Sequence, residues 1–69
     1  ATGNLNSAIE QYEKVRKHFP YYINAQINLL DLYSETGKTE NAKALFNELF
    51  EKSPDNPRLL EYKKKFQQP

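Results

Sequence analysis

Apolar residues recur at intervals of three and four along the first twenty positions, which is the spacing of one face of an α-helix. This stripe consists of Leu5, Ala8, Ile9, Tyr12, Val15 and Phe19. Charged side chains such as Glu10 and Lys14 take the opposite face. Pro20 cannot donate a main-chain hydrogen bond, and it disfavours helical angles in the residue before it. The pattern therefore predicts an amphipathic helix that stops at Pro20.

A second helix is predicted over residues 22–35. Its apolar residues are Ala25, Leu29, Leu30, Leu32 and Tyr33. Because this apolar band is broad, we expect the helix to be buried on two sides. Thr36 and Gly37 follow it, and glycine readily adopts the left-handed conformation that ends many helices.

Two more helices are predicted, over residues 39–52 and 57–67. The first repeats the pattern of the opening helix with Ala42, Leu45, Phe46, Leu49 and Phe50. Between the two lie Asp55, Asn56 and Pro57. An Asp or Asn side chain can cap the amides of the next helix, and proline is well tolerated in the first turn. The last helix places Leu59, Tyr62 and Phe66 on one stripe and is otherwise polar.

Residues of the first and second halves match at a constant offset of 34 positions. The pairs are Gly3 with Gly37, Ala8 with Ala42, Tyr12 with Phe46, Val15 with Leu49, and Pro20 with Pro54. A period in this range is typical of a unit that buries its apolar face only by stacking on another copy of itself. The repeat favours a helical stack over a plain four-helix bundle, which is the alternative reading of the same amphipathic pattern.

One stretch carries a family resemblance: Gln26-x2-Leu29-Leu30-x2-Tyr33, then Gly37, Ala42-x3-Phe46, Leu49 and Pro54. It resembles the tetratricopeptide repeat, whose unit is a helical hairpin of 34 residues. Gln26 stands where the family often has Trp, and Leu30 where it often has Gly. The resemblance implies an all-α fold of about four helices, in which antiparallel hairpins stack as a short right-handed solenoid. Residues 1–69 would form one domain: residues 1–22 the second half of a repeat, 23–56 a complete repeat, and 57–69 the first half of a repeat or a capping helix.

The resemblance also implies a function, which is non-enzymatic binding of a peptide or partner protein in a concave groove. The residues expected to face that groove are Asn24, Ile27, Asn28, Asp31, Arg58, Tyr62 and Lys65. Asn28 and Arg58 are similar in placement and type to two members of the carboxylate clamp with which some family members bind chaperone tails. An ordinary polar groove is the alternative interpretation of the same two residues.

A second function is a structural or self-associating segment of a longer helical solenoid. The helices over 5–19 and 57–67 each lack the hairpin partner of a full repeat, so apolar residues such as Phe66 are expected to be exposed there. Neighbouring repeats or a second copy could cover these ends. A homo-oligomer is therefore an alternative to a partner of another kind.

Composition narrows the range of partners and compartments. The chain has 69 residues, no cysteine and a formal net charge of +1. A field this weak does not favour nucleic acid, and RNA-binding pentatricopeptide repeats usually have a period one residue longer. No apolar run approaches the roughly 20 residues of a membrane-spanning helix, so membrane insertion is not expected. The default expectation is a soluble, cytoplasmic chain, although the absence of thiols is compatible with any compartment.

No catalytic, metal-binding or cofactor-binding constellation is predicted. His18 is the single histidine, and it lies near a helix end, where a cation is favourable. Carboxylates such as Glu13 and Glu48 are expected to pair in solvent with lysines such as Lys14 and Lys52. The run Lys63-Lys64-Lys65 points in several directions from a helix and is expected to solvate it. Two isolated glycines cannot form a phosphate-binding loop.

Overall fold

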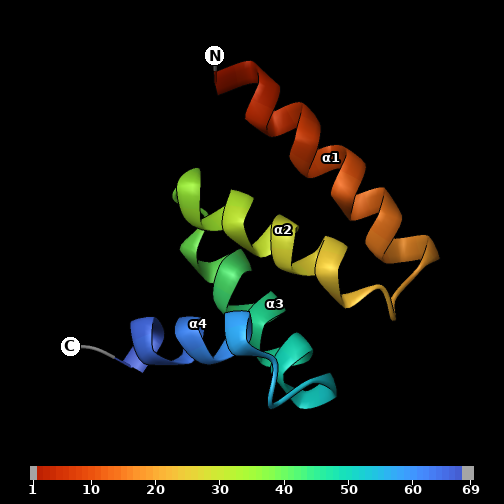
Figure 1. The fold of residues 1–69 in the computed structure, drawn as a ribbon. Helices are drawn as coiled ribbons and strands as arrows, with labels where there is room; N and C mark the ends of the chain where they lie inside the picture. Colours follow the sequence, from red (N-terminus) through yellow and green to blue (C-terminus); the bar gives the residue numbers. More distant parts are fainter. Residues whose placement is uncertain (1, 68–69) are drawn as a thin grey trace.

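The chain folds into four helices that pack one after another (Figure 1). A computed structural model describes residues 2–67, with α1 (Thr2–His18), α2 (Ile23–Glu35), α3 (Thr39–Lys52) and α4 (Pro57–Gln67). The helix α1 packs on α2, α2 on α3, and α3 on α4. The all-α class and the sequential hairpins predicted from the sequence are confirmed, and so are the bounds of α3 and α4.

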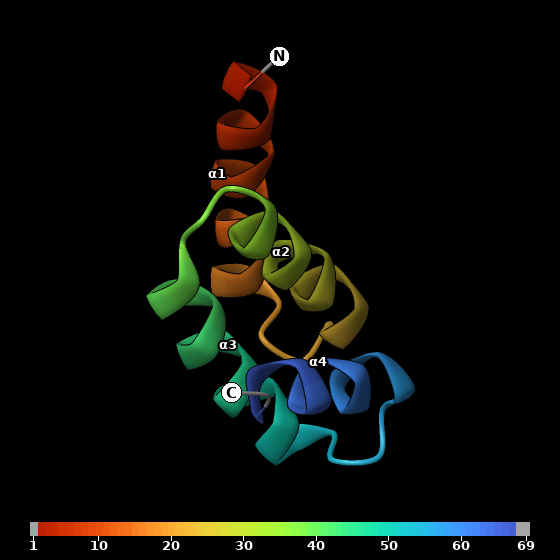
Figure 2. The ribbon, with the colours of Figure 1, turned by 90° about the vertical axis from the view of Figure 1, so that its left-hand side faces the viewer.

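The helices form two layers. Figure 2 shows α1 and α3 on one side and α2 and α4 on the other. A salt bridge joins the two helices of each layer. Arg16 of α1 pairs with Glu48 of α3, and Arg58 of α4 pairs with Asp31 of α2. The thinnest dimension of the Cα trace is 17 Å, which fits two layers of helices packed about 8 to 10 Å apart.

The end of α2 shows why glycine is needed at position 37. Gly37 has a φ of +77°, a conformation that side chains with a Cβ rarely adopt. This lets the amide of Lys38 bond the carbonyl of Tyr33 at 2.9 Å, and the amide of Gly37 bond that of Ser34 at 3.4 Å. The two bonds form the Schellman arrangement that satisfies the last carbonyls of a helix. The predicted glycine cap is confirmed, whereas Gly3, its counterpart in the repeat, lies inside α1.

The core is supplied mainly by α2 and α3, and α2 is buried between α1 and α3 as its broad apolar band predicts. The side chains with no more than 1% exposure are Gln26, Ile27, Leu29, Leu30, Ala42, Leu49 and Leu59. Ile27 was expected on the outward face of α2, and that placement is wrong because the residue is fully buried. It lies one helical turn from both Asn24 and Leu30, at the boundary between the polar face of α2 and its buried face.

The two departures from the family pattern lie inside this core. Leu30 is fully buried, so the position that often carries glycine is filled here by an aliphatic side chain. Gln26 is 1% exposed, and its Nε2 donates to the carbonyl of Pro20 at 2.6 Å. Its Oε1 has no hydrogen-bond partner among the described residues. The amide at position 26 thus ties α2 to the turn before it, which a Trp ring at this position could not do in the same way.

Aromatic rings fix α4 on α3. The ring of Phe46 lies 5.3 Å from that of Phe50 and meets Phe66 edge to face at 5.2 Å. Tyr62 lies 5.6 Å from Phe66 on the same helix. Edge-to-face and offset contacts at these distances are favourable for aromatic rings. The expectation that Phe66 is an exposed end residue is therefore wrong, because its ring packs against the core.

Candidate functional site

A connected group of polar side chains spans α2 and α4. The Arg58 guanidinium donates to Asp31 Oδ2 at 2.7 Å and to Asn28 Oδ1 at 3.3 Å. The Tyr62 hydroxyl donates to the other oxygen of Asp31. Asn28 Nδ2 in turn donates to the Tyr12 hydroxyl of α1 at 3.5 Å. We call Asn28, Asp31, Arg58 and Tyr62 the α2–α4 polar cluster.

The local folding of α4 positions this cluster. Asn56 precedes the helix, and its Oδ1 accepts a hydrogen bond from the amide of Arg58 at 3.0 Å. This is the capping role expected for Asp or Asn before α4. Leu59 is completely buried and anchors the first turn of α4 to the core, while Arg58 beside it is exposed. The cap and the buried leucine together fix the first turn of α4 so that Arg58 reaches its partners on α2.

The charges in the cluster compensate one another. The side chains of Arg58 and Asp31 are 46% and 40% exposed, so their ion pair contributes little to stability. Burial, together with the hydrogen bond to Asp31, raises the pKa of the Tyr62 hydroxyl to about 12. The phenol therefore stays protonated and remains a donor at neutral pH. The cluster offers a ligand both hydrogen-bond donors and acceptors rather than one strong charge.

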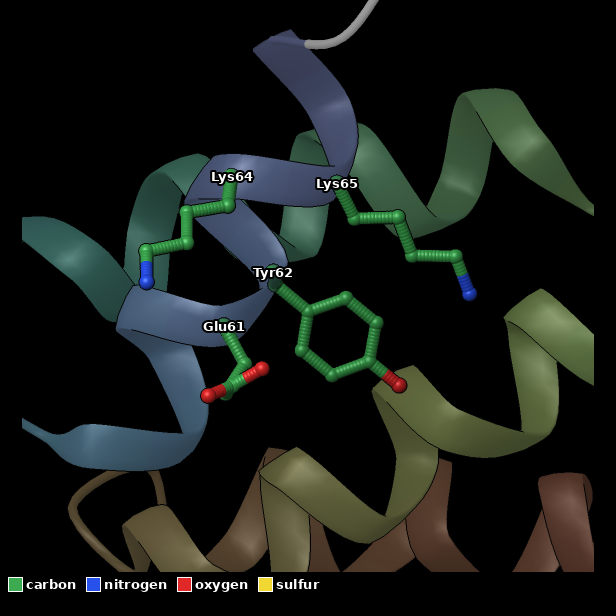
Figure 3. Close-up of a pocket in the computed structure, with 4 residues that line it drawn as sticks. All are labelled: Glu61, Tyr62, Lys64 and Lys65. Atoms are coloured by element: carbon green, nitrogen blue, oxygen red, sulfur yellow. The ribbon is translucent and has the colours of Figure 1, made fainter.

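A shallow cavity of about 300 Å³ lies beside the cluster and is lined by Glu61, Tyr62, Lys64 and Lys65. Figure 3 shows the Tyr62 hydroxyl directed toward α2, with Lys65 on one side of the ring and Glu61 and Lys64 on the other. The Lys65 ammonium lies 5.7 Å from the Tyr62 ring centroid, within the range of a cation–π contact. Glu61 and Lys64 were not among the residues predicted for the site, because they lie outside the stripe of Leu59, Tyr62 and Phe66 on α4.

The structure brings together four of the seven residues expected in the groove, and Lys65 lies against Tyr62 next to them. Asn24 is exposed on the first turn of α2. Ile27 contributes to the core instead, so it cannot line a groove. Asp31 is not an unpaired charge on this surface, since Arg58 neutralises it. The two residues are 27 positions apart, so local spacing in the sequence does not predict their ion pair.

Two further polar contacts join α1 to α2 and α1 to α3. The Tyr33 hydroxyl donates to Glu13 at 2.6 Å, and Arg16 pairs with Glu48. Glu13 and Glu48 were expected to pair in solvent with lysines near them in sequence, and this expectation is wrong. Both carboxylates instead bond residues on other helices. The difference arises because stacking brings α1 and α3 side by side, which gives Arg16 a partner 32 positions away.

The two perturbed tyrosines predict a loss of stability at alkaline pH. Burial and the hydrogen bond to Glu13 raise the pKa of Tyr33 to about 12 in the folded chain, as burial does for Tyr62, against an ordinary value of 10.0. Below pH 10 the folded and unfolded chains are both protonated at these sites, so the contribution is constant. Between pH 10 and 12 the unfolded chain releases protons that the folded chain retains, so the free energy of unfolding falls as pH rises.

The double variant Tyr33→Phe/Tyr62→Phe should show a smaller fall over the same interval. Urea unfolding followed by circular dichroism at a series of pH values measures this slope for both proteins. Lysine deprotonation affects the two proteins alike, so the difference in slope reports on the tyrosines. Equal slopes would show that these hydroxyls titrate alike in the folded and unfolded chains.

The described part of the chain contains no group of three or more His, Cys, Asp or Glu side chains placed to hold a metal ion. His18 is exposed at the end of α1. Among residues 2–67, no helix combines the length and apolar character needed to cross a membrane. The features that remain are a stack of helical hairpins and a polar surface across α2 and α4. Together they define a helical-repeat protein.

The family model of the tetratricopeptide repeat matches residues 1–65, so the chain belongs to the tetratricopeptide repeat family. The resemblance carried by Leu29, Tyr33, Gly37, Ala42 and Pro54 is thereby confirmed. Members of this family are generally protein–protein interaction modules and typically lack catalytic activity. No curated protein and no solved structure matches the chain significantly.

Proposed function

We propose that the chain is a non-enzymatic interaction module that binds a peptide or partner protein across α2 and α4. The observation that carries the proposal is the α2–α4 polar cluster. Asn28, Asp31, Arg58 and Tyr62 are held in place by bonds to one another while remaining partly or largely exposed. Side chains ordered before binding lose less conformational entropy when a ligand arrives.

Arg58 sets the chemistry of the ligand. A guanidinium presents donors in a planar fork that suits a carboxylate or a main-chain carbonyl. Its present partner, Asp31, is a half-exposed carboxylate that a ligand carboxylate could replace. Asn28 offers an amide beside it, and these two residues correspond to the two clamp-like positions identified in the sequence. We expect an extended peptide with main-chain carbonyls or an acidic group near Arg58 to bind best.

The double variant Asn28→Ala/Arg58→Ala tests the site. Selection from a random peptide library on the unaltered chain would provide ligands, whose binding to both proteins is then compared by fluorescence anisotropy. We expect the variant to lose about tenfold or more in affinity, because a hydrogen bond to a charged group contributes about 1.5 to 3 kcal/mol. Its helicity should be retained, since the exposed ion pair contributes little to folding.

The matched control is Gln11→Ala/Lys14→Ala, which likewise removes one amide and one cation, from the exposed face of α1. This control should bind the selected peptides as the unaltered chain does. Affinity that is unchanged in the Asn28/Arg58 variant would contradict the proposed site. A similar loss in both variants would show a nonspecific effect of charge removal.

We also propose the division into half, complete and half repeats, with residues 23–56 as the complete unit. The hairpin of α2 and α3 and the counterpart positions 34 residues away support it. At the positions of buried Leu29 and Leu30, α4 has the exposed residues Lys63 and Lys64. Burying two ammonium groups is unfavourable, so this face of α4 supports a capping role rather than the self-associating segment kept as the alternative.

A further inference from the structure

The turn between α1 and α2 carries most of the large apolar surface that the described residues expose. Phe19 is 63% exposed, Tyr21 83% and Tyr22 58%, and Leu60 on α4 is 40% exposed. Figure 1 shows this turn at the margin of the molecule, where α1 and α2 meet. We call residues 19–22 the aromatic turn.

The other turn of the same type shows that the fold does not require aromatic residues here. Residues 53–56, which lie 34 positions later, read Ser-Pro-Asp-Asn in place of Phe-Pro-Tyr-Tyr. The same main-chain hydrogen bond closes both turns, at 3.1 Å from Tyr22 to Phe19 and at 3.2 Å from Asn56 to Ser53. Polar residues thus form the same turn, so the three exposed aromatic rings are not needed for the turn to fold.

The aromatic turn also lacks a side-chain cap for the N-terminus of α2. Asn56 caps α4 with its side chain, whereas Tyr22 occupies the equivalent position before α2 and makes no such bond. Asparagine is among the best residues at this position, and tyrosine has no group that can replace it. A local stabilisation that the chain uses in one turn is therefore absent from the other.

Two side chains, one buried and one exposed, hold the main chain of the aromatic turn. Gln26 Nε2 and Lys52 Nζ both donate to the carbonyl of Pro20, at 2.6 and 3.3 Å. The Lys52 ammonium also lies 5.4 Å from the centroid of the Tyr21 ring. The backbone of the turn is thus fixed while its rings face solvent, which lowers the entropy lost on binding.

The shape and charge of the patch indicate what it contacts. Residues 19–22 do not line any of the five best-formed surface cavities in the described part of the chain, which favours a flat contact over a groove for an extended peptide. Its exposed aromatic area is on the order of 400 Å², half of the roughly 800 Å² per partner in a stable dimer. Between Glu13 and Asp31 the sequence has no acidic residue, whereas Lys17 and His18 directly precede the turn.

We propose that the aromatic turn, with Lys17 and Lys52 beside it, docks the protein on an anionic phospholipid surface. Tyrosine and phenylalanine rings are favourable at the boundary between head groups and acyl chains, where the tyrosine hydroxyls remain hydrated. The lysine ammonium groups would lie against lipid phosphates and carboxylates. The contact is peripheral, and it leaves the α2–α4 polar cluster free for a protein partner.

Cosedimentation with vesicles tests this proposal. The unaltered chain should bind vesicles of phosphatidylserine and phosphatidylcholine and bind pure phosphatidylcholine more weakly. The vesicle partition coefficient of the variant Phe19→Ser/Tyr21→Ser/Tyr22→Asn should be at least about tenfold lower than that of the unaltered chain. That of Lys17→Gln should be about fivefold lower. The matched control Leu60→Ser removes an exposed apolar side chain elsewhere and should bind as the unaltered chain does.

Circular dichroism checks that the triple variant is folded, and Tyr21→Ser alone repeats the test at the most exposed ring. Failure of the unaltered chain to bind anionic vesicles would overturn the proposal, as would undiminished binding by the folded triple variant. Equal binding to neutral vesicles would refute the role of the lysines. A dimer without vesicle binding, abolished by the triple variant, would show that a second copy covers the turn.

Discussion

Replacing Leu29 with alanine should unfold most of the chain at room temperature. Leu29 is completely buried in the α2 core between α1 and α3. Truncating a leucine at such a site removes about 2 to 5 kcal/mol from the free energy of unfolding. A domain of this size without a metal or disulfide has only about 3 to 5 kcal/mol available. We therefore expect loss of most of the helical signal by circular dichroism, or a much lower urea midpoint.

Leu60→Ala is the matched control for this prediction. The chemical change and the helical backbone are the same, but Leu60 is 40% exposed on α4. We expect a change within about 0.5 kcal/mol, because exposed substitutions away from special features have small effects. Comparable destabilisation by the two variants would contradict the placement of Leu29 in the core.

Replacing Ala42 with leucine should destabilise the chain by about 1 to 3 kcal/mol through overpacking. Ala42 is 1% exposed and lies in the core, in the first half of α3, which packs on α2. Three additional carbon atoms at this position require neighbouring side chains or the helix itself to move. Urea denaturation of the variant measures the loss as a lower midpoint with a similar slope.

Ala44→Leu provides the comparison on the same helix. Ala44 is exposed two positions further along α3, and alanine and leucine have similar helix propensities. This variant should keep the stability of the unaltered chain. If Ala42→Leu were equally well tolerated, close packing of α3 would not require a small residue at position 42. The match between Ala8 and Ala42 in the repeat would then have no packing explanation.

The helices could be predicted from the sequence because each of their signals is local. Apolar spacing placed α3 and α4 correctly, Gly37 marked the end of α2, and Asn56 the start of α4. The constant offset of 34 positions, together with the family pattern, then indicated how the helices stack. Each of these inferences depends on a few neighbouring residues or on a repeated spacing, so tertiary contacts were not needed to make them.

The polar contacts between helices could not be predicted in the same way. The pairing of Arg58 with Asp31, and that of Arg16 with Glu48, depend on which faces meet after stacking. Helical spacing also places Ile27 near Asn24 and Asp31, which suggested an outward face, whereas two-sided burial of α2 takes it into the core. The sequence therefore indicated the helices that carry the α2–α4 polar cluster, while the bonds within the cluster required the structure.

Nuclear magnetic resonance mapping of a selected peptide would test the central claim, that α2 and α4 form the binding face. The peptide would come from the library selection described above and be titrated into the isotopically labelled chain. We predict that the largest amide shift changes cluster at Asn28, Asp31, Arg58 and Tyr62. Changes concentrated on α1 and α3, or confined to the aromatic turn, would contradict the account.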